Sequence, residues 1–145
     1  MKIHSVLSIA FAFAFALAAF AGCRPDLTGL EVVGVDELAS WRTSRGDLTI
    51  CDANNDDTRA RFGVIPGALL LSSYRDYDAA AELPVDKERT LVFYCHSEMC
   101  GAAADAARKA LAAGHRDVRV MSAGIAGWRD AGRPVDAHAR PGGAS

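Results

Sequence analysis

The residues of this 145-residue chain best placed to do chemistry lie between Tyr94 and Ala102. An apolar run, rich in β-branched and aromatic side chains, ends at Cys95, and a helical pattern begins at Gly101. Unpaired backbone N–H groups in such a loop and in the first helical turn create a positive potential that stabilises a thiolate and holds anions. We therefore expect the pKa of Cys95 to fall below the ~8.5 of a free cysteine and Cys95 to be a nucleophile. The alternative is a buried structural cysteine at the end of a strand.

Other residues of the same loop are candidates for binding a substrate. They are His96, Ser97, Glu98, Met99 and Gly101. A histidine beside the nucleophile could act as an acid or base or supply a cation, although an exposed loop histidine is the more ordinary interpretation. Ser97 could donate a hydrogen bond to a bound anion or simply cap the next turn.

Strand and helix patterns alternate along the chain and predict how this loop is positioned. Strands are expected at residues 30–33, 48–51, 68–71, 90–94 and 117–121, and helices at 36–43, within 73–83, at 101–113 and at 124–131. Such alternation predicts an α/β fold in which helices cover a central parallel sheet. Ligands of these sheets bind at the carboxyl ends of the strands, which is where Cys95 lies.

Three local predictions follow from the same patterns. Asp36 is expected to cap the first helix, and the polar stretch 54–61 precedes a turn expected at residues 63–67. In the helix at 101–113, three polar side chains are expected on the exposed side and an Ala/Leu face on the sheet. The polar residues are Asp105, Arg108 and Lys109, and the packing face is Ala103, Ala107, Ala110 and Leu111.

Four segments resemble the rhodanese-like family, and they occur in the family's order along the chain. They are Cys51-Asp52-Ala53, residues 61–68 (RFGVIPGA, with Val64 where the family has His), residues 92–95 (VFYC) and residues 118–135 with their Trp and Gly-x-Pro-Val. The resemblance extends from Leu30 to Val135. It implies the rhodanese-like sheet with helices on both faces.

The resemblance also implies sulfur transfer without a metal or an organic cofactor. Cys95 would attack the outer sulfur of thiosulfate or another small donor, hold it as a persulfide and pass it to an acceptor such as a thiol. Asp52 would be a supporting residue at the end of its strand. The loop departs from many thiosulfate-using members, because it has no Arg or Lys between Cys95 and Gly101 and contains Glu98 instead. This argues against thiosulfate as the preferred donor.

Cys100 occupies the position five residues after Cys95, where the family often has Arg, and the Cys-x-x-x-x-Cys arrangement resembles a subset of the family. It could be a resolving thiol that takes sulfur from Cys95 or forms a disulfide with it, which requires Cα atoms within about 7 Å. It could also be only a small residue that starts the helix. Zinc would need a set such as Cys51, Cys95, Cys100 and His96, whose spacing fits no zinc pattern, so we expect no metal. Cys51 itself is expected in the core.

Three functions remain open at this stage. The first is a sulfurtransferase or persulfide carrier, the second a thiol–disulfide module that uses Cys95 and Cys100, and the third a non-catalytic rhodanese-like binding domain. A cysteine phosphatase would need Arg six residues after the nucleophile, where Gly101 stands. A thioredoxin-like protein would need Cys-x-x-Cys, which the sequence lacks.

The first 22 residues have the pattern of an export signal. Lys2 precedes 13 consecutive apolar residues from Ile9 to Ala21, fewer than the roughly 20 that a membrane-spanning helix needs. Residues 20–23 (FAGC) resemble a bacterial lipobox with Cys23 as the lipidated residue, and cleavage near Ala21 is the alternative. We therefore expect an exported protein, periplasmic or on the cell surface and lipid-anchored. Residues 23–29 would be a tether, 30–136 the domain and 137–145 a disordered tail. The net charge of −2 predicts no nucleic-acid partner.

Overall fold

The computed structural model describes residues 24–140. The predicted export signal, its lipidation site at Cys23 and the last five residues lie outside the described residues. Within residues 24–140, no helix is long and apolar enough to cross a membrane.

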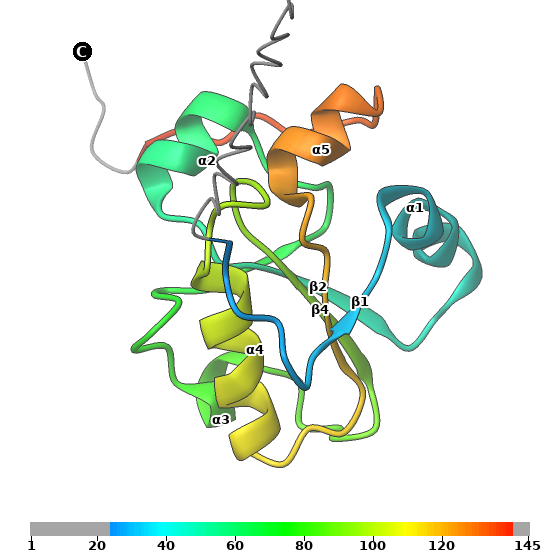
Figure 1. Ribbon diagram of the computed structural model, residues 1–145, viewed down its shortest axis with the longest axis vertical. Coiled ribbons are helices and arrows are strands. Elements are labelled where there is room, and N and C mark those ends of the chain that lie inside the picture. The colour runs from blue at the N-terminus through cyan, green and yellow to red at the C-terminus, as the bar shows by residue number, and fades with distance from the viewer. Residues whose placement is uncertain (1–23, 141–145) are drawn as a thin grey trace, which may run out of the picture.

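The chain alternates between strands and helices, as predicted (Figure 1). The strands are β1 (Glu31–Val32), β2 (Leu48–Asp52), β3 (Leu69–Leu70), β4 (Thr90–Tyr94) and β5 (Val118–Val120). The helices are α1 (Val35–Ser44), α2 (Asp56–Phe62), α3 (Ala79–Glu82), α4 (Ala102–Ala112) and α5 (Gly124–Asp130). All strand pairs are parallel, and the order across the sheet is β1-β5-β4-β2-β3. The predicted α/β class and parallel sheet are confirmed.

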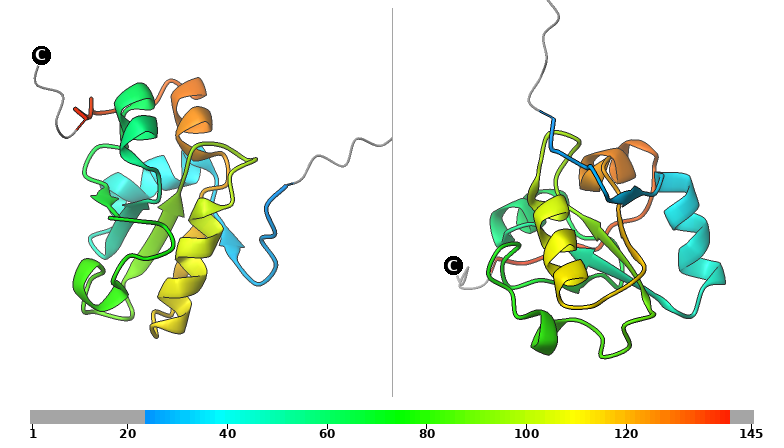
Figure 2. Two further views of the ribbon diagram at one scale, coloured as in Figure 1. Left: turned by 90° about the vertical axis from the view of Figure 1, so that its left-hand side faces the viewer. Right: turned by 60° about the horizontal axis from the view of Figure 1, so that its bottom comes forward.

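The sheet separates two hydrophobic clusters, and β4 contributes to both. Leu91 and Phe93 pack with α3 and α4, whereas Val92 and Tyr94 pack on the opposite face with α1 and α5. Figure 2 shows α4 and α1 on opposite sides of the sheet. Alternate side chains of a strand point to opposite faces, so a central strand covered on both faces must be apolar throughout. This explains why β4 was the clearest strand in the sequence.

The predicted packing face of α4 was partly wrong. Leu111 is exposed, and Ala106 is fully buried in its place. The buried positions are Ala103, Ala104, Ala106, Ala107 and Ala110, which follow the spacing of one helical face. Because all five side chains are small, the helix backbone can lie close to β4 and β5.

The predicted start of α1 was also wrong. The N-cap is Gly34, and no side chain caps the helix. Asp36 lies in the first turn, where its negative charge stabilises the positive end of the helix dipole. Its carboxylate also accepts a hydrogen bond from Arg133 at 2.7 Å.

The polar stretch at 54–61, to which the sequence patterns assigned no element, contains most of α2. The side chain of Asn55 caps this helix by accepting a hydrogen bond from the backbone N–H of Thr58 at 2.9 Å. Asp56 and Asp57 follow in the first turn, and the helix ends at Gly63, whose φ is +78°. These are ordinary helix-start and helix-stop signals. They were missed because the seven-residue helix is polar along most of its length.

Asn55→Ala is expected to lower the free energy of unfolding by about 1 kcal/mol, because the N–H of Thr58 loses its acceptor. Urea denaturation of the two proteins measures this difference. Asn55→Asp should retain most of the stability, since aspartate caps equally well. An equal loss in both variants would show that the cap bond is not the cause.

Candidate functional site

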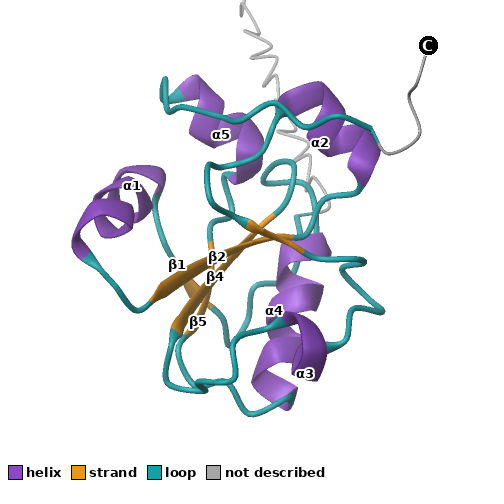
Figure 3. Cartoon of the chain, turned by 180° about the vertical axis from the view of Figure 1, so that it is seen from behind, coloured by secondary structure: helices purple, strands orange, loops and turns teal. Residues whose placement is uncertain are grey.

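Cys95 follows the last residue of β4, as predicted. This strand lies between β5 and β2 in the sheet. Figure 3 shows the strands and the helices around them. The residues after Cys95 form a loop that leads into α4. The first turn of α5 holds this loop in place: the N–H of Ile125 donates to the carbonyl of Cys95 at 2.8 Å, and that of Ala126 to His96 at 2.9 Å. Gly124 permits this approach, because a Cβ there would lie 2.5–2.6 Å from backbone atoms of His96 and Ser97.

Cys95 and Cys100 are both free thiols, and the Sγ of Cys95 lies against the backbone of Cys100. Cys95 is buried, with 2% of its surface exposed, and Cys100 is half-buried. The Cys95 thiol donates to the carbonyl oxygen of Cys100, which lies 3.0 Å from Sγ, and its interaction with the Cys100 thiol shifts the pKa of both groups. The nearby backbone N–H groups of His96 and Ala103 act to lower the pKa of Cys95. The loop and the start of α4 therefore surround the pair with donors.

The predicted low pKa belongs to Cys100 and not to Cys95. A hydrogen bond from the Cys95 thiol, helped by the N–H groups of His96 and Ala102, lowers the pKa of Cys100 to about 5. The same bond and burial raise the pKa of Cys95. The position of Cys95 Sγ, 3.0 Å from the carbonyl oxygen of Cys100, agrees with a raised pKa of Cys95. A thiolate there would face the carbonyl oxygen with no proton between the two atoms. In this reduced conformation, Cys95 keeps the shared proton and Cys100 carries the charge.

The rate of alkylation by iodoacetamide should report this charge directly. Thiolate persists above its pKa, so the reaction of the pair should stay fast at pH 6–7 and fall only as the pH approaches about 5. Cys95→Ala should move the midpoint upward, because Cys100 loses its strongest donor. A wild-type midpoint near the ~8.5 of a free thiol would contradict the arrangement.

A cavity of about 340 Å³ opens beside the pair, between α2, α4 and the segment before α3. Cys100 lines it, together with His96, Gly101 and Asn54. Asn54 is 9% exposed, and its Nδ2 has no hydrogen-bond partner. Asn54 therefore adds a buried amide with an unsatisfied donor to the wall of the cavity.

Asp52, the predicted supporting residue, is fully buried at the end of β2 and holds this edge of the sheet together. Its carboxylate accepts from the backbone N–H of Asn54 at 2.7 Å, from the hydroxyl of Tyr94 and from Nε of Arg59 at 3.4 Å. Arg59 also donates to the carbonyl oxygens of Asp52 and Leu71. The network fixes the ends of β2 and β4, and hence the positions of Asn54 and Cys95.

Of the remaining candidate residues of the loop, one lines the cavity and three do not. The ring of His96 lies 4.5 Å from that of Phe62, and His96 faces the cavity. Ser97, Glu98 and Met99 are not among the residues that line the cavity. Ser97 accepts the N–H of Cys100, Glu98 lies 3.6 Å from Arg24, and Met99 is 57% exposed.

Cys51 lies in the core of the sheet, where burial raises the pKa of its thiol to about 12. Among residues 24–140, no three His, Cys, Asp or Glu side chains are grouped to hold a metal ion.

The family model for the rhodanese-like domain matches residues 35–131. The chain belongs to the rhodanese-like family. The HTH-type transcriptional regulator Rv0324 of Mycobacterium tuberculosis is 37% identical over 95 residues, which are 66% of this chain and 40% of that protein. The chain therefore matches less than half the length of this curated relative.

Solved structures share the rhodanese-like fold. A Rhodopseudomonas palustris protein of unknown function, described as a possible tyrosine phosphatase, is 26% identical, with a TM-score of 0.61 over 74% of this chain and 85% of the other. A thiosulfate sulfurtransferase from Pseudomonas aeruginosa is 20% identical, with a TM-score of 0.62 over 76% of this chain and 21% of the other. At that identity the second likeness concerns the fold alone.

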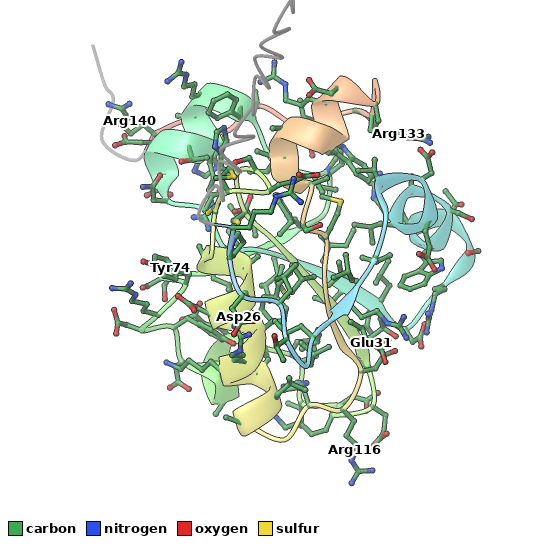
Figure 4. All side chains as sticks on the ribbon, in the orientation of Figure 1. Asp26, Glu31, Tyr74, Arg116, Arg133 and Arg140 are labelled. Atoms are coloured by element: carbon green, nitrogen blue, oxygen red, sulfur yellow. The ribbon has the colours of Figure 1, made fainter. Side chains whose placement is uncertain are left out.

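In this rhodanese-like domain, the charges that face the cavity come mainly from outside the active loop. Arg75, between β3 and α3, lines the cavity, and so does Asp105 from the first turn of α4. Figure 4 shows Tyr74, the neighbour of Arg75 in the chain, beside α4. The sequence identified neither Arg75 nor Asn54 as a site residue, since only the folded chain brings them to the loop.

Proposed function

We propose that this rhodanese-like domain is a sulfurtransferase or persulfide carrier that holds sulfur on Cys95, with Cys100 as its partner thiol. The observation that carries the proposal is the thiol pair, in which Cys95 Sγ lies 3.0 Å from the carbonyl oxygen of Cys100 and Cys100 lines a cavity at the start of α4. With thiosulfate, a thiolate attacks the outer sulfur, the S–S bond breaks and sulfite leaves with the electron pair. An acceptor thiolate or cyanide then removes the outer sulfur and regenerates the thiol.

The backbone donors have a direct role in this reaction. The nearby N–H groups of His96, Ala102 and Ala103 act to lower the pKa values of the two thiols and would stabilise the negative charge of a persulfide. These donors are fixed in place by the loop and by the start of α4, so no reorganisation is needed when charge develops. This supports group transfer at the pair.

The proposal is tested by thiocyanate formation from thiosulfate and cyanide, with glutathione hydropersulfide as a second donor. The double variant Cys95→Ser/Cys100→Ser should lose turnover by at least ~100-fold, the usual effect of removing an activated nucleophile. Cys51→Ala is the matched control, since it also removes a buried thiol but lies in the sheet core. Equal turnover in the double variant and the wild type would exclude the proposal.

Arg75→Gln is expected to raise KM for thiosulfate by about two- to fivefold, the effect of up to ~1 kcal/mol for an exposed charge. Asp105→Asn should lower KM, because it removes a like charge from the cavity. Both effects should shrink at high salt. The control is Arg116→Gln, another exposed arginine, which lies at the other end of the molecule (Figure 4). A similar rise in KM for both arginine variants would show that Arg75 has no specific role.

A thiol–disulfide module is the second candidate, because both cysteines are free thiols and the Sγ of Cys95 lies against the backbone of Cys100. Oxidation would join the sulfurs and release two electrons to an oxidant such as a dithiol–disulfide partner. Loss of sulfur transfer from every donor, together with a reversible Cys95–Cys100 disulfide in glutathione redox buffers, would favour this function.

We also propose that the protein is exported and lipid-anchored through Cys23, and that its partners are the small donor, a thiol acceptor and the membrane. Residues 24–28, which would follow the lipidated cysteine, lie near the active loop and α4. Arg24 lies 3.6 Å from Glu98, and Arg108 on α4 binds the carbonyl oxygens of Asp26 and Thr28. Metabolic labelling with a fatty acid should modify the full chain but not Cys23→Ser.

A further inference from the structure

We propose that sulfur enters this site at Cys100 and passes from Cys100 to Cys95. This inference rests on the proposed sulfur-transfer function. It assigns the first contact with the donor to the second cysteine of the loop, and it gives the buried cysteine the role of holding the sulfur.

Access to the two sulfurs differs. Cys95 is only 2% exposed and is not among the residues that line the cavity. Its thiol donates to the carbonyl oxygen of Cys100. Cys100 is half-buried and lines the cavity. A donor in the cavity therefore meets Cys100 before Cys95.

The cavity has the features of a donor site. Asn54 lines the same space as Cys100; its side chain is nine-tenths buried, and its Nδ2 has no hydrogen-bond partner. Arg75 adds a positive charge and Asp105 a negative charge. These groups suit a small sulfane-sulfur donor with an acidic group, which the guanidinium of Arg75 can attract while the outer sulfur reaches Cys100.

The charge on the pair favours the same order of events. Cys100 carries the negative charge of the reduced pair, and Cys95 keeps the proton. A thiolate is the reactive form of a cysteine, so the sulfur that faces the donor is also the better nucleophile in this conformation.

The two steps balance. The Cys100 thiolate attacks the outer sulfur of thiosulfate, the S–S bond breaks and sulfite leaves, which gives a persulfide anion on Cys100. Cys95 then gives its proton to the outer sulfur and attacks that atom as a thiolate. The bond between Cys100 and the outer sulfur breaks, so Cys95 carries the persulfide and Cys100 is again a thiolate. No oxidant or reductant is consumed.

Burial explains what the second step achieves. The persulfide on Cys95 would lie beneath Cys100, out of the solvent-facing cavity and beside the N–H groups of His96 and Ala103. It would be shielded from reductants in bulk solution, while the regenerated Cys100 thiolate remains available for the return of the sulfur.

The test is a single-turnover loading experiment on the full chain with thiosulfate and, separately, glutathione hydropersulfide. The loading reactions are run at about pH 9, where even an unassisted thiol is largely ionised. They are quenched rapidly and analysed by mass spectrometry. Single-cysteine variants of the pair are required, because Cys95 and Cys100 lie between the same two basic residues and share a tryptic peptide. Cys51→Ala is the control for removal of a thiol outside the site.

Cys95→Ala is expected to gain one sulfur on Cys100, and cyanide should remove that sulfur at least tenfold faster than it removes the sulfur of the wild type. Cys100→Ala is expected to load Cys95 at least tenfold more slowly than the wild type. The inference is overturned if Cys100→Ala loads at the wild-type rate, or if Cys95→Ala takes up no sulfur while the wild type does. If neither the wild type nor any variant loads, it is the proposed function that fails.

Discussion

Arg59→Met is expected to lower the free energy of unfolding by about 3–5 kcal/mol, because it leaves the buried carboxylate of Asp52 without its cation. Arg59 is 5% exposed and Asp52 is fully buried, so water cannot replace the lost partner. The variant also deprives the carbonyl oxygens of Asp52 and Leu71 of a donor. Chemical denaturation monitored by circular dichroism measures the loss.

A double-variant cycle separates the charge effect from the loss of packing. Asp52→Asn/Arg59→Met contains no buried charge at this place, so it should be more stable than Arg59→Met alone. If Arg59→Met costs less than about 1 kcal/mol, the ion pair does not support this edge of the sheet. The result bears on the site because Asp52 also holds the N–H of Asn54 and the hydroxyl of Tyr94.

Gly124→Ala is expected to reduce the rate of persulfide formation by about 10- to 100-fold, since displacement of reacting groups by ~1 Å has effects of this size. A Cβ at this position would lie 2.5 Å from the carbonyl carbon of His96 and 2.6 Å from the N of Ser97. These are backbone atoms of the active loop, so the loop and not a flexible side chain must move. Single-turnover loading with thiosulfate provides the rate.

Gly132→Ala is the matched control for this variant. Gly132 follows the other end of α5 and also has a positive φ, +69° against +63° for Gly124, but a Cβ there would meet nothing within 4 Å. Both variants have a similar positive-φ strain. Only Gly124→Ala adds an overlap with the loop backbone, so it should lose more stability and it alone should slow loading. Equal rates in the two variants would mean that the close approach of α5 does not position the loop.

The sequence predicted the central sheet well because its signals are local. Residues 90–94 form β4 as predicted, since a strand buried on both faces must be continuously apolar. The position of Cys95 at the end of this strand follows from the same signal. In α2, by contrast, the polar composition concealed a helix whose only local signals were the Asn55 cap and the acidic first turn.

The features that sequence reasoning missed depend on distant contacts. Arg59 looks like a surface residue of a polar segment, and its buried role appears only when β2 and β3 lie beside it. Arg75 reaches the cavity because the segment before α3 passes α4. The hydrogen bonding between Cys95 and Cys100, which raises the pKa of the first and lowers that of the second, depends on how the loop folds back.

The central claim is that the Cys95–Cys100 pair carries transferable sulfur, and intact-protein mass spectrometry tests it most directly. The reduced chain is measured before and after thiosulfate or glutathione hydropersulfide, and again after cyanide. We expect the wild type and Cys51→Ala to gain one sulfur that cyanide removes, and Cys95→Ser/Cys100→Ser to gain none. A chain that gains no sulfur from either donor, or a double variant that gains it equally well, would contradict the account.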